Sequence, residues 1–290
     1  MPATLAPAPV LQSSTLNHLL HARYGESPSG TWATPATTEA AAKLAGLLSH
    51  RSVRSFSPEP LPEGTLEWIV AAAQSAATSS NLQTWSVVAV EDEDRKSKAA
   101  ELASNQPFIR QAPLFLAFIA DLSRLRFVSD KSGLPGAGLD YQEMFLMASL
   151  DAALAAQNAV VAAEALGLGI CYVGAARNKP VEFAEFLGLP PTAYVVFGLA
   201  VGVPAAENAA AIKPRLPLEE VLHRESYSTA RRKENVKLYD AAMRRFYAGQ
   251  NLDVPGDWSL HSAKRVASVE ALRGRDRLKE ILRRLGFALR

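Results

Sequence analysis

The stretch from Tyr141 to Leu166 constrains the fold most, because it reads as one long helix that is apolar nearly all round. Alanine, leucine and methionine dominate it, and Glu143, Asp151 and Glu164 are its only charged residues. A helix with apolar residues on every side must be buried on more than one side. The sequence therefore predicts either a central core helix or a helix at a large subunit interface.

Shorter elements precede and follow this helix. Helices are predicted over Thr37–Ser49, with Thr37 as the cap, and from Pro62 to Ala73. The predicted strands are Ser86–Glu91, Leu114–Ala120, Ile170–Val173 and Tyr194–Val203. The second of these strands is too apolar to face water on either side. A last helical region covers roughly Ser228–Gly249 and Ala263–Leu285.

The N-terminal residues differ from the rest in composition. Residues 1–35 hold five prolines and two formal charges, Arg23 and Glu26. Such a segment forms a core poorly, so we expect a flexible N-terminal arm over residues 1–36, with one short helical candidate at Leu16–Tyr24. Residues 37–290 contain no repeat or low-complexity linker, and we expect one domain that includes a C-terminal helical extension over about residues 228–290.

The composition argues against several classes of protein. Cys171 is the single cysteine, so no disulfide forms within the chain and a reducing compartment suits it. The sequence has no Cys-x-x-Cys or His-Glu-x-x-His arrangement, and we expect no metal. No uncharged apolar run approaches the ~20 residues of a membrane helix, and the start of the chain does not resemble a secretory signal. We therefore expect a cytoplasmic protein without a membrane partner.

The charge is unevenly distributed along the chain. Residues 231–290 hold 15 lysines and arginines against 7 acidic residues, whereas residues 1–230 hold 16 against 22. A basic tail is one signature of nucleic-acid binding. Here the basic residues alternate with acidic ones in helical patterns. This favours docking onto an acidic surface or attraction of an anionic ligand, and we expect no nucleic-acid partner.

Two short basic segments lie far apart in the chain. His50-Arg51-Ser52-Val53-Arg54 carries two arginines, and Lys213-Pro214-Arg215 carries two cations around a stiff proline. Guanidinium groups form paired, charge-assisted hydrogen bonds with phosphate, and an ammonium adds a point charge. Each pair alone is more typical of a solvated surface. If the two segments converge, their four cations suit a phosphomonoester dianion.

Two further segments have the composition of a ligand site. Thr78–Gln83 holds five hydroxyl or amide side chains in six residues, which is typical of a turn and also suits a polar heterocycle. Tyr172–Ala175 ends a strand with small residues, and Gly174 lets the backbone approach a ring closely. The sequence lacks the three spaced glycines of a dinucleotide-binding loop, a phosphate loop with lysine, and a Ser-His-Asp pattern. These features favour a cofactor that carries the chemistry itself.

Five motifs together resemble one known family. HRSVRSF, TSSNLQTW, AQNAVVAAEALGLGICYVGAARN, FGLAVGVP and KPRLP occur in this order. In this combination the chain is similar to the FMN-dependent nitroreductase family, and within it to the oxygen-insensitive NADPH nitroreductases and bacterial flavin reductases. The resemblance covers about residues 40–290.

The resemblance implies an α+β fold, in which helices wrap a central, mostly antiparallel sheet, and a homodimer with FMN at its interface. It implies that the FMN phosphate and ribityl chain contact His50, Arg51, Ser52, Arg54, Lys213 and Arg215. Ser79 or Ser80, with Gln106, would reach the polar edge of the flavin ring; the choice between the two serines stays open. The backbone of Tyr172, Val173, Gly174 and Ala175 would lie near the flavin N5.

The implied activity is ping-pong, two-electron hydride transfer from NADPH or NADH to nitroaromatics, quinones or flavins. The flavin N5 would carry the hydride, so no catalytic side chain is expected. Gln250 aligns best with an arginine that contacts the NADPH 2′-phosphate in relatives, so the donor preference stays open, as does the physiological acceptor. The alternatives are a flavin-fragmenting or dehalogenating member of the family and a non-catalytic flavin- or nucleotide-binding regulator.

Overall fold

The computed structural model describes residues 13–25, 35, 37–208, 210–250 and 254–290. The chain divides into two compact units. The sheet unit comprises Ser52–Ala210 and Val266–Arg290, and the helical unit comprises the residues up to Arg51 together with Ala211–Arg265. These boundaries differ from the division after residue 36 that the sequence suggested.

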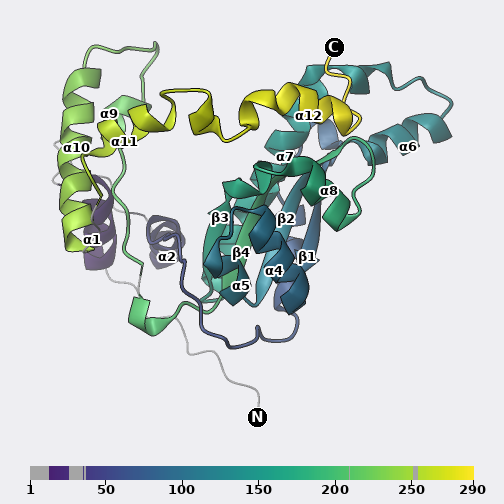
Figure 1. Ribbon diagram of the computed structural model, residues 1–290. Helices are drawn as coiled ribbons and strands as arrows, with labels where there is room; N and C mark the ends of the chain where they lie inside the picture. The colour runs from purple at the N-terminus through teal and green to yellow at the C-terminus, as the bar shows by residue number, and fades with distance from the viewer. Residues whose placement is uncertain (1–12, 26–34, 36, 209, 251–253) are drawn as a thin grey trace. The chain divides into compact units, whose positions relative to one another are not determined.

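The sheet unit is built on a four-stranded antiparallel sheet in the order β1–β2–β4–β3 (Figure 1). The strands are β1 (Trp85–Val90), β2 (Leu114–Asp121), β3 (Gly169–Val173) and β4 (Ala193–Gly202). Each matches a predicted strand to within one residue at either end. A parallel bridge between Ser52 and Ile170 adds a short segment beside β3. The expected α+β fold with a mostly antiparallel sheet is confirmed.

Helices cover both faces of the sheet, and β2 is therefore buried on both sides, as its composition predicts. Phe115, Ala117 and Ile119 share one core with the helices α4, α5 and α8, and alternate residues of β2 share a second core with α3 and α7. The bounds of these helices are α3 (Thr65–Gln74), α4 (Glu93–Leu102), α5 (Pro107–Gln111), α7 (Gln142–Ala165) and α8 (Pro180–Leu187). Three of them were not predicted from the sequence: α5 and α8, which are short, and α4, whose sequence is polar.

α7 is the long apolar helix that the sequence predicts, and its small residues lie against the sheet. Ala155, Ala159 and Ala163 are fully buried in the core that it shares with α3. By length and composition α7 also meets the requirements of a membrane-spanning helix. Its packing on the sheet, and the buried carboxylate of Asp151 at its centre, identify it instead as the core helix of this unit.

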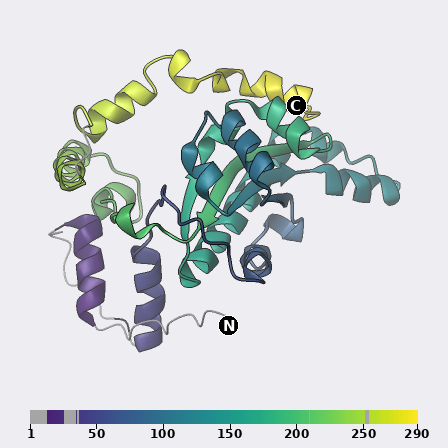
Figure 2. The same cartoon turned by 60° about the horizontal axis from the view of Figure 1, so that its bottom comes forward.

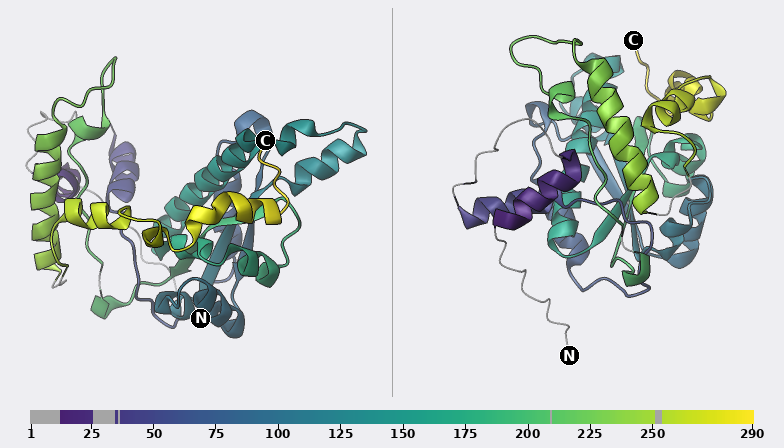
Figure 3. Two further views of the ribbon diagram at one scale, coloured as in Figure 1. Left: turned by 45° about the horizontal axis from the view of Figure 1, so that its top comes forward. Right: turned by 90° about the vertical axis from the view of Figure 1, so that its left-hand side faces the viewer.

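A short helix and its following loop extend from the sheet unit between β2 and α7 (Figure 3). This helix, α6 (Ser123–Lys131), has no buried residue. Phe127 and Leu134 expose 65% and 64% of their surface. The segment is therefore fixed to the sheet mainly at its beginning, where polar contacts with β1 and β2 are described below.

The C-terminal region is less continuous than expected. Where one helix was predicted from Ala263 to Leu285, the chain has α11 (Trp258–Arg265), two short 3₁₀ turns and α12 (Leu278–Arg284). Arg273 and Gly274 adopt left-handed backbone angles, with φ of 56° and 82°, which interrupt a right-handed helix. Beyond this break, Leu282 and Phe287 pack with Tyr194 of β4 in the sheet unit.

The helical unit comprises α1 (Ser13–Tyr24), α2 (Thr38–Leu48), α9 (Leu218–Val221), α10 (Arg232–Gly249) and α11. α1 and α2 run side by side (Figure 2). Thr37 caps α2 as predicted, since its side chain accepts a hydrogen bond from the Ala40 N–H at 3.1 Å. Leu16 and Leu19 are buried against Ala45.

Within the expected flexible arm, the helical candidate at Leu16–Tyr24 is present as α1. This stretch is a packed helix three residues longer than the helical candidate, because leucines spaced along one face of α1 meet an apolar face of α2. The remaining residues of the proposed arm, except Gly25 and Pro35, lie outside the described part of the chain.

Candidate functional site

The helical unit brings the two basic segments together through Arg23. The guanidinium of Arg23 donates to the carbonyl of His50 at 2.5 Å and to the carbonyl of Lys213 at 2.8 Å. The Arg215 N–H in turn donates to the Arg23 carbonyl at 2.8 Å. Arg51, Lys213 and Arg215 expose their side chains. The backbones of His50 and Lys213, one from each basic segment, thus meet at Arg23 within this unit.

Ser52 and Arg54 belong to the sheet unit and lie beside β3. The Val53 N–H donates to the Ile170 carbonyl at 2.8 Å. Val53 is buried, and an added Cβ at Gly169 would lie only 2.7 Å from its side chain, which explains the glycine there. Because side chains alternate along an extended segment, Ser52 and Arg54 are the exposed neighbours of the buried Val53.

The polar turn Thr78–Gln83 has an unusual backbone. Ser80, Asn81 and Gln83 all have left-handed φ values, of 49°, 55° and 50°. Each such residue costs about 1–2 kcal/mol, so the surrounding structure must hold the turn in place. Ser79 and Ser80 expose their side chains. The hydroxyls that were predicted to face a ligand are thus presented at the surface of the sheet unit.

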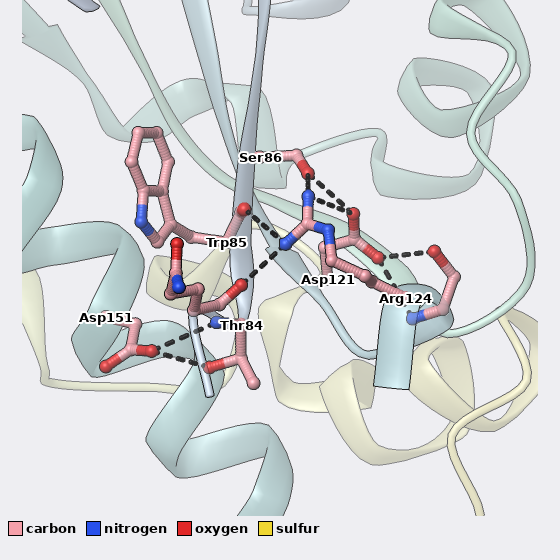
Figure 4. Close-up of polar contacts among 8 residues, drawn as sticks. Thr84, Trp85, Ser86, Asp121, Arg124 and Asp151 are labelled. Atoms are coloured by element: carbon pink, nitrogen blue, oxygen red, sulfur yellow. Dashed lines mark hydrogen bonds and ion pairs between the residues drawn. The ribbon is translucent and has the colours of Figure 1, made fainter. Parts of the chain in front are cut away.

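Asp151 of α7 holds this turn from the core side. Its carboxylate accepts hydrogen bonds from the Thr78 hydroxyl at 2.6 Å, the Ser79 N–H at 3.0 Å, and the Thr84 N–H and hydroxyl at 3.1 and 2.8 Å. Figure 4 shows the bonds to Thr84. Burial alone would raise the pKa of Asp151, but the bonds from Thr78, Ser79 and Thr84 outweigh it and hold the pKa below its ordinary value.

Arg124, near the start of α6, holds the end of the same turn from the other side (Figure 4). Its guanidinium donates to the Gln83 carbonyl at 2.6 Å and to the Ser86 hydroxyl at 2.9 Å. Asp121 accepts from the Ser86 hydroxyl at 2.6 Å and lies 3.9 Å from the Arg124 guanidinium. The turn is therefore fixed by an acid on one side and a base on the other.

Gln106 and the end of β3 are connected through Asn178. Gln106 precedes Pro107 at the start of α5 and follows two residues with left-handed backbone angles. The Asn178 amide donates to the Ser104 hydroxyl at 2.6 Å, two residues before Gln106. Arg275 donates to the side-chain oxygen of Asn178 and to the Gly174 carbonyl at 3.0 Å. The structure thus joins two of the predicted contact segments within the sheet unit.

Two residues at the end of β3, Tyr172 and Gly174, show what this part of the site can do: the first by its protonation state, the second by the space around it. Burial, with a smaller contribution from Glu164, raises the pKa of the Tyr172 phenol to about 12. That phenol therefore stays protonated at ordinary pH and is no general base. At Gly174 the nearest side-chain atom to an added Cβ is the Arg177 guanidinium, at 3.6 Å. The surrounding protein has room for a side chain at this glycine.

Three supporting residues escaped the sequence analysis: Arg23, Asp151 and Arg275. A signal existed for two of them, because Arg23 is one of two charges in a charge-poor segment and Asp151 is the central charge of an apolar helix. Gln250 caps the end of α10, and its side-chain amide donates to the Gly249 carbonyl at 3.5 Å. Within the described ranges, no cluster of His, Cys, Asp and Glu suits a metal ion.

Comparison with known proteins finds similarity to one family and to reductases. Residues 47–203 match the nitroreductase family, and residues 213–290 match the C-terminal domain of that family. The chain is 36% identical to a CR(VI) reductase of Pseudomonas sp. (strain G-1) over 242 residues, covering 83% of this chain and 97% of the relative. It is 36% identical to an FMN reductase [NAD(P)H] of Bacillus subtilis over 246 residues, covering 84% and 97%.

A solved structure agrees with these matches. NfrA2 of B. megaterium superimposes with a TM-score of 0.79 at 35% identity and covers 86% of this chain and 98% of its own. The matched residues 47–203 include the whole sheet, the polar turn and α7. With more than half of the sequence matched and with relatives above 30% identity along nearly their full length, the chain belongs to the nitroreductase family.

Proposed function

We propose that this chain is an FMN-dependent NAD(P)H oxidoreductase that reduces nitroaromatics, quinones or free flavins. Family membership and the names of the relatives support the redox class and the donor. The observation that carries the proposal is the link through Arg23 between the backbones of His50 and Lys213. It joins the backbones of two distant segments that carry exposed cations, and four such cations suit a phosphomonoester dianion such as the FMN phosphate.

The residues present fit FMN in kind and in exposure. We assign the phosphate and ribityl contacts to His50, Arg51, Ser52, Arg54, Lys213 and Arg215, and the contacts with the polar ring edge to Gln106 and either Ser79 or Ser80. The backbone of Tyr172, Val173, Gly174 and Ala175 is assigned to the ring near N5. The room that the protein leaves for a side chain at Gly174 supports a ligand as the reason for the glycine.

FMN, when bound, supplies the chemistry: it accepts a hydride from NAD(P)H and passes two electrons to the acceptor. The protein's part is binding, orientation and electrostatics. The side chains assigned to the polar ring edge, Gln106 and Ser79 or Ser80, would donate hydrogen bonds to the flavin and so favour negative charge on it. No side chain is assigned as an acid or a base; burial raises the pKa of Tyr172 to about 12, so its phenol keeps its proton at ordinary pH and cannot act as a base.

We further propose a homodimer. α7 exposes Leu146, Leu150, Leu154 and Val161 by 52%, 56%, 48% and 39%, and their spacing places them along one face of the helix. A continuous apolar stripe of this kind is typical of a subunit interface. A second copy of the chain would cover it, with FMN at the interface. Analytical ultracentrifugation at micromolar concentration should show a dimer, and a folded, flavin-loaded monomer would contradict this assignment.

A cytoplasmic location completes the proposal. The sequence holds a single cysteine, Cys171, which is buried in the core of the sheet unit, and a chain with one cysteine forms no disulfide within itself, which suits a reducing compartment.

Steady-state kinetics test the proposed reaction. With NADPH and a quinone or nitroaromatic varied together, double-reciprocal plots should be parallel, because the donor leaves before the acceptor binds. Replacing Arg51 or Arg215 by alanine should weaken FMN binding by about 1.5–3 kcal/mol each, the value of a charge-assisted contact. FMN binding without any turnover would instead favour a non-catalytic flavin-binding regulator.

A further inference from the structure

Arg23 is a buried cation at the end of α1. It exposes only 4% of its surface. All three guanidinium nitrogens donate to backbone carbonyls: Nε to Leu48 at 2.9 Å, Nη2 to His50 at 2.5 Å and Nη1 to Lys213 at 2.8 Å. The planar fork of a guanidinium can meet three carbonyls at fixed angles, which the point charge of a lysine cannot do. The arginine is therefore specific to this arrangement.

The carbonyls that Arg23 contacts belong to two separate parts of the chain. Leu48 and His50 lie at the C-terminal end of α2, where the partial negative charge of the helix favours a cation. Lys213 lies 190 residues from Arg23 along the chain. The Arg23 carbonyl also accepts the Arg215 N–H at 2.8 Å, so this residue holds the second segment on both sides of Pro214.

Apolar contacts fix Arg23 in this position. Leu16 and Leu19 of α1 are buried with Ala45 of α2, and Ile212, next to Lys213, packs against the same cluster. α1 lies outside the residues that match the family, which begin at residue 47. The support of the two basic segments therefore comes from an N-terminal extension rather than from the matched domain.

We propose that Arg23 is a positioning residue that sets the spacing between the His50–Arg51 and Lys213–Arg215 segments, and that the N-terminal helix thereby determines selectivity for the phosphorylated flavin. This inference rests on the proposed phosphate contacts of those segments. Arg23 itself does not bind the ligand, because its nitrogens are bonded to carbonyls. Its loss leaves the cations present but changes the distance between them.

Riboflavin provides the test, because it has the ring and the ribityl chain of FMN but no phosphate. Apoprotein prepared from the full-length holoenzyme is titrated with FMN and with riboflavin, and flavin fluorescence quenching gives the two dissociation constants. In Arg23→Met and Arg23→Lys, the preference for FMN over riboflavin should fall at least about tenfold, in line with the loss of supporting groups at ligand sites. The riboflavin constant should stay within about threefold of the wild type, because Arg23 acts on the phosphate contacts.

Arg244→Met is the matched control. It removes the same charge from the same unit, where the exposed Arg244 pairs with Asp257 at 3.0 Å. Its FMN preference should remain that of the wild type. Arg23→Lys keeps the charge and is the milder change, so it decides the matter if Arg23→Met does not fold. A folded Arg23→Lys protein with wild-type preference for FMN would overturn the inference.

Arg215→Met separates this inference from the proposed function. If the wild type binds FMN no more tightly than riboflavin, and Arg215→Met changes nothing, the phosphate site itself is wrong. If the wild type prefers FMN and Arg215→Met removes that preference, but a folded Arg23→Lys protein retains it, the phosphate site stands and only the role of Arg23 is wrong.

Discussion

The two units hold their candidate ligand segments by opposite means. In the helical unit, the buried cation of Arg23 gathers carbonyl groups of the two basic segments. In the sheet unit, the buried carboxylate of Asp151 gathers N–H and hydroxyl groups of the polar turn. Both are single charges on helices, and neither is among the predicted contact residues. A positive charge thus supports the carbonyl groups of the basic segments, and a negative charge supports the donor groups of the polar turn. The predicted contact side chains Arg51, Arg215, Ser79 and Ser80 are exposed.

The helices that carry these two charges differ in their place within the fold. Asp151 lies at the centre of α7, which packs across the sheet and falls in the family-matched region. Arg23 lies at the end of α1, which precedes that region and packs through two leucines. We therefore expect loss of Asp151 to affect the whole sheet unit, and loss of Arg23 to act locally.

The largest expected effect is on global stability in Asp151→Asn. The amide can accept through only one oxygen, so buried donors of Thr78, Ser79 and Thr84 lose their partner. We expect a loss of about 3 kcal/mol in the free energy of unfolding, measured by urea denaturation, since hydrogen bonds to charged groups contribute about 1.5–3 kcal/mol each. Asp121→Asn is the control: it removes a neighbouring carboxylate that bonds Ser86 and Ser123 but not the turn. Equal losses in both variants would contradict the special role of Asp151.

The second prediction concerns acid pH and the same carboxylate. Because the pKa of Asp151 is lower in the folded protein than its ordinary value, its contribution to stability is complete above the unfolded pKa of about 4 and is lost as pH falls through the lower folded value. Asp151→Asn should therefore reduce the fall in stability below pH 4. Urea denaturation across pH 2.5–6, about the window set by these values, measures this, and a variant with an unchanged acid slope would disprove it.

Much of the sheet unit was predictable because its signals are local. β2 is an unbroken apolar run, and each strand was placed to within one residue. α4 was missed because its sequence, EDRKSKAAEL, is polar, and its buried Lys96 is stabilised by the distant Ala112 carbonyl at 2.9 Å. Such a contact cannot be read from a short window of sequence.

In the candidate site, too, some residues could be identified from local sequence and others only from distant contacts. Arg51 and Arg215 were recognisable because their chemistry suits phosphate, whatever their surroundings. Arg23 and Asp151 stand out as charges in their segments, but their roles depend on partners far away in the chain: Lys213 is 190 residues from Arg23, and Thr84 is 67 residues from Asp151. Residue type alone can identify a candidate ligand contact. The residues that hold such a contact in place can be identified only from the tertiary structure.

The third prediction compares local opening in the two units. In Arg23→Met, hydrogen exchange should be faster by about tenfold in peptides covering α1 and residues 211–217, since the Arg215 N–H bonds to a backbone that has lost its anchor. Exchange in β2 and α7 should be unchanged. Mass spectrometry of the exchanged protein gives both values. Faster exchange throughout the sheet unit would show that Arg23 acts globally and would remove the contrast with Asp151.

The smallest expected effect is at Gly174. Alanine fits there, with its Cβ 3.6 Å from Arg177, so unfolding should be unchanged. FMN affinity should fall several-fold, or about 1 kcal/mol, because the methyl group would crowd the ring. Gly198→Ala is the control, since its Cβ would overlap the Phe115 ring and should destabilise the sheet instead. Unaltered FMN affinity in Gly174→Ala would remove this backbone from the ring contact.

The absorbance spectrum of the purified protein, recorded without oxygen during titration with NADPH, shows whether the chain is a flavin oxidoreductase. We expect a yellow protein with one FMN per chain, whose visible absorbance is lost on addition of one equivalent of NADPH and restored by a quinone. A colourless protein that cannot be reconstituted with FMN, or bound FMN that neither NADPH nor NADH reduces, would contradict this expectation.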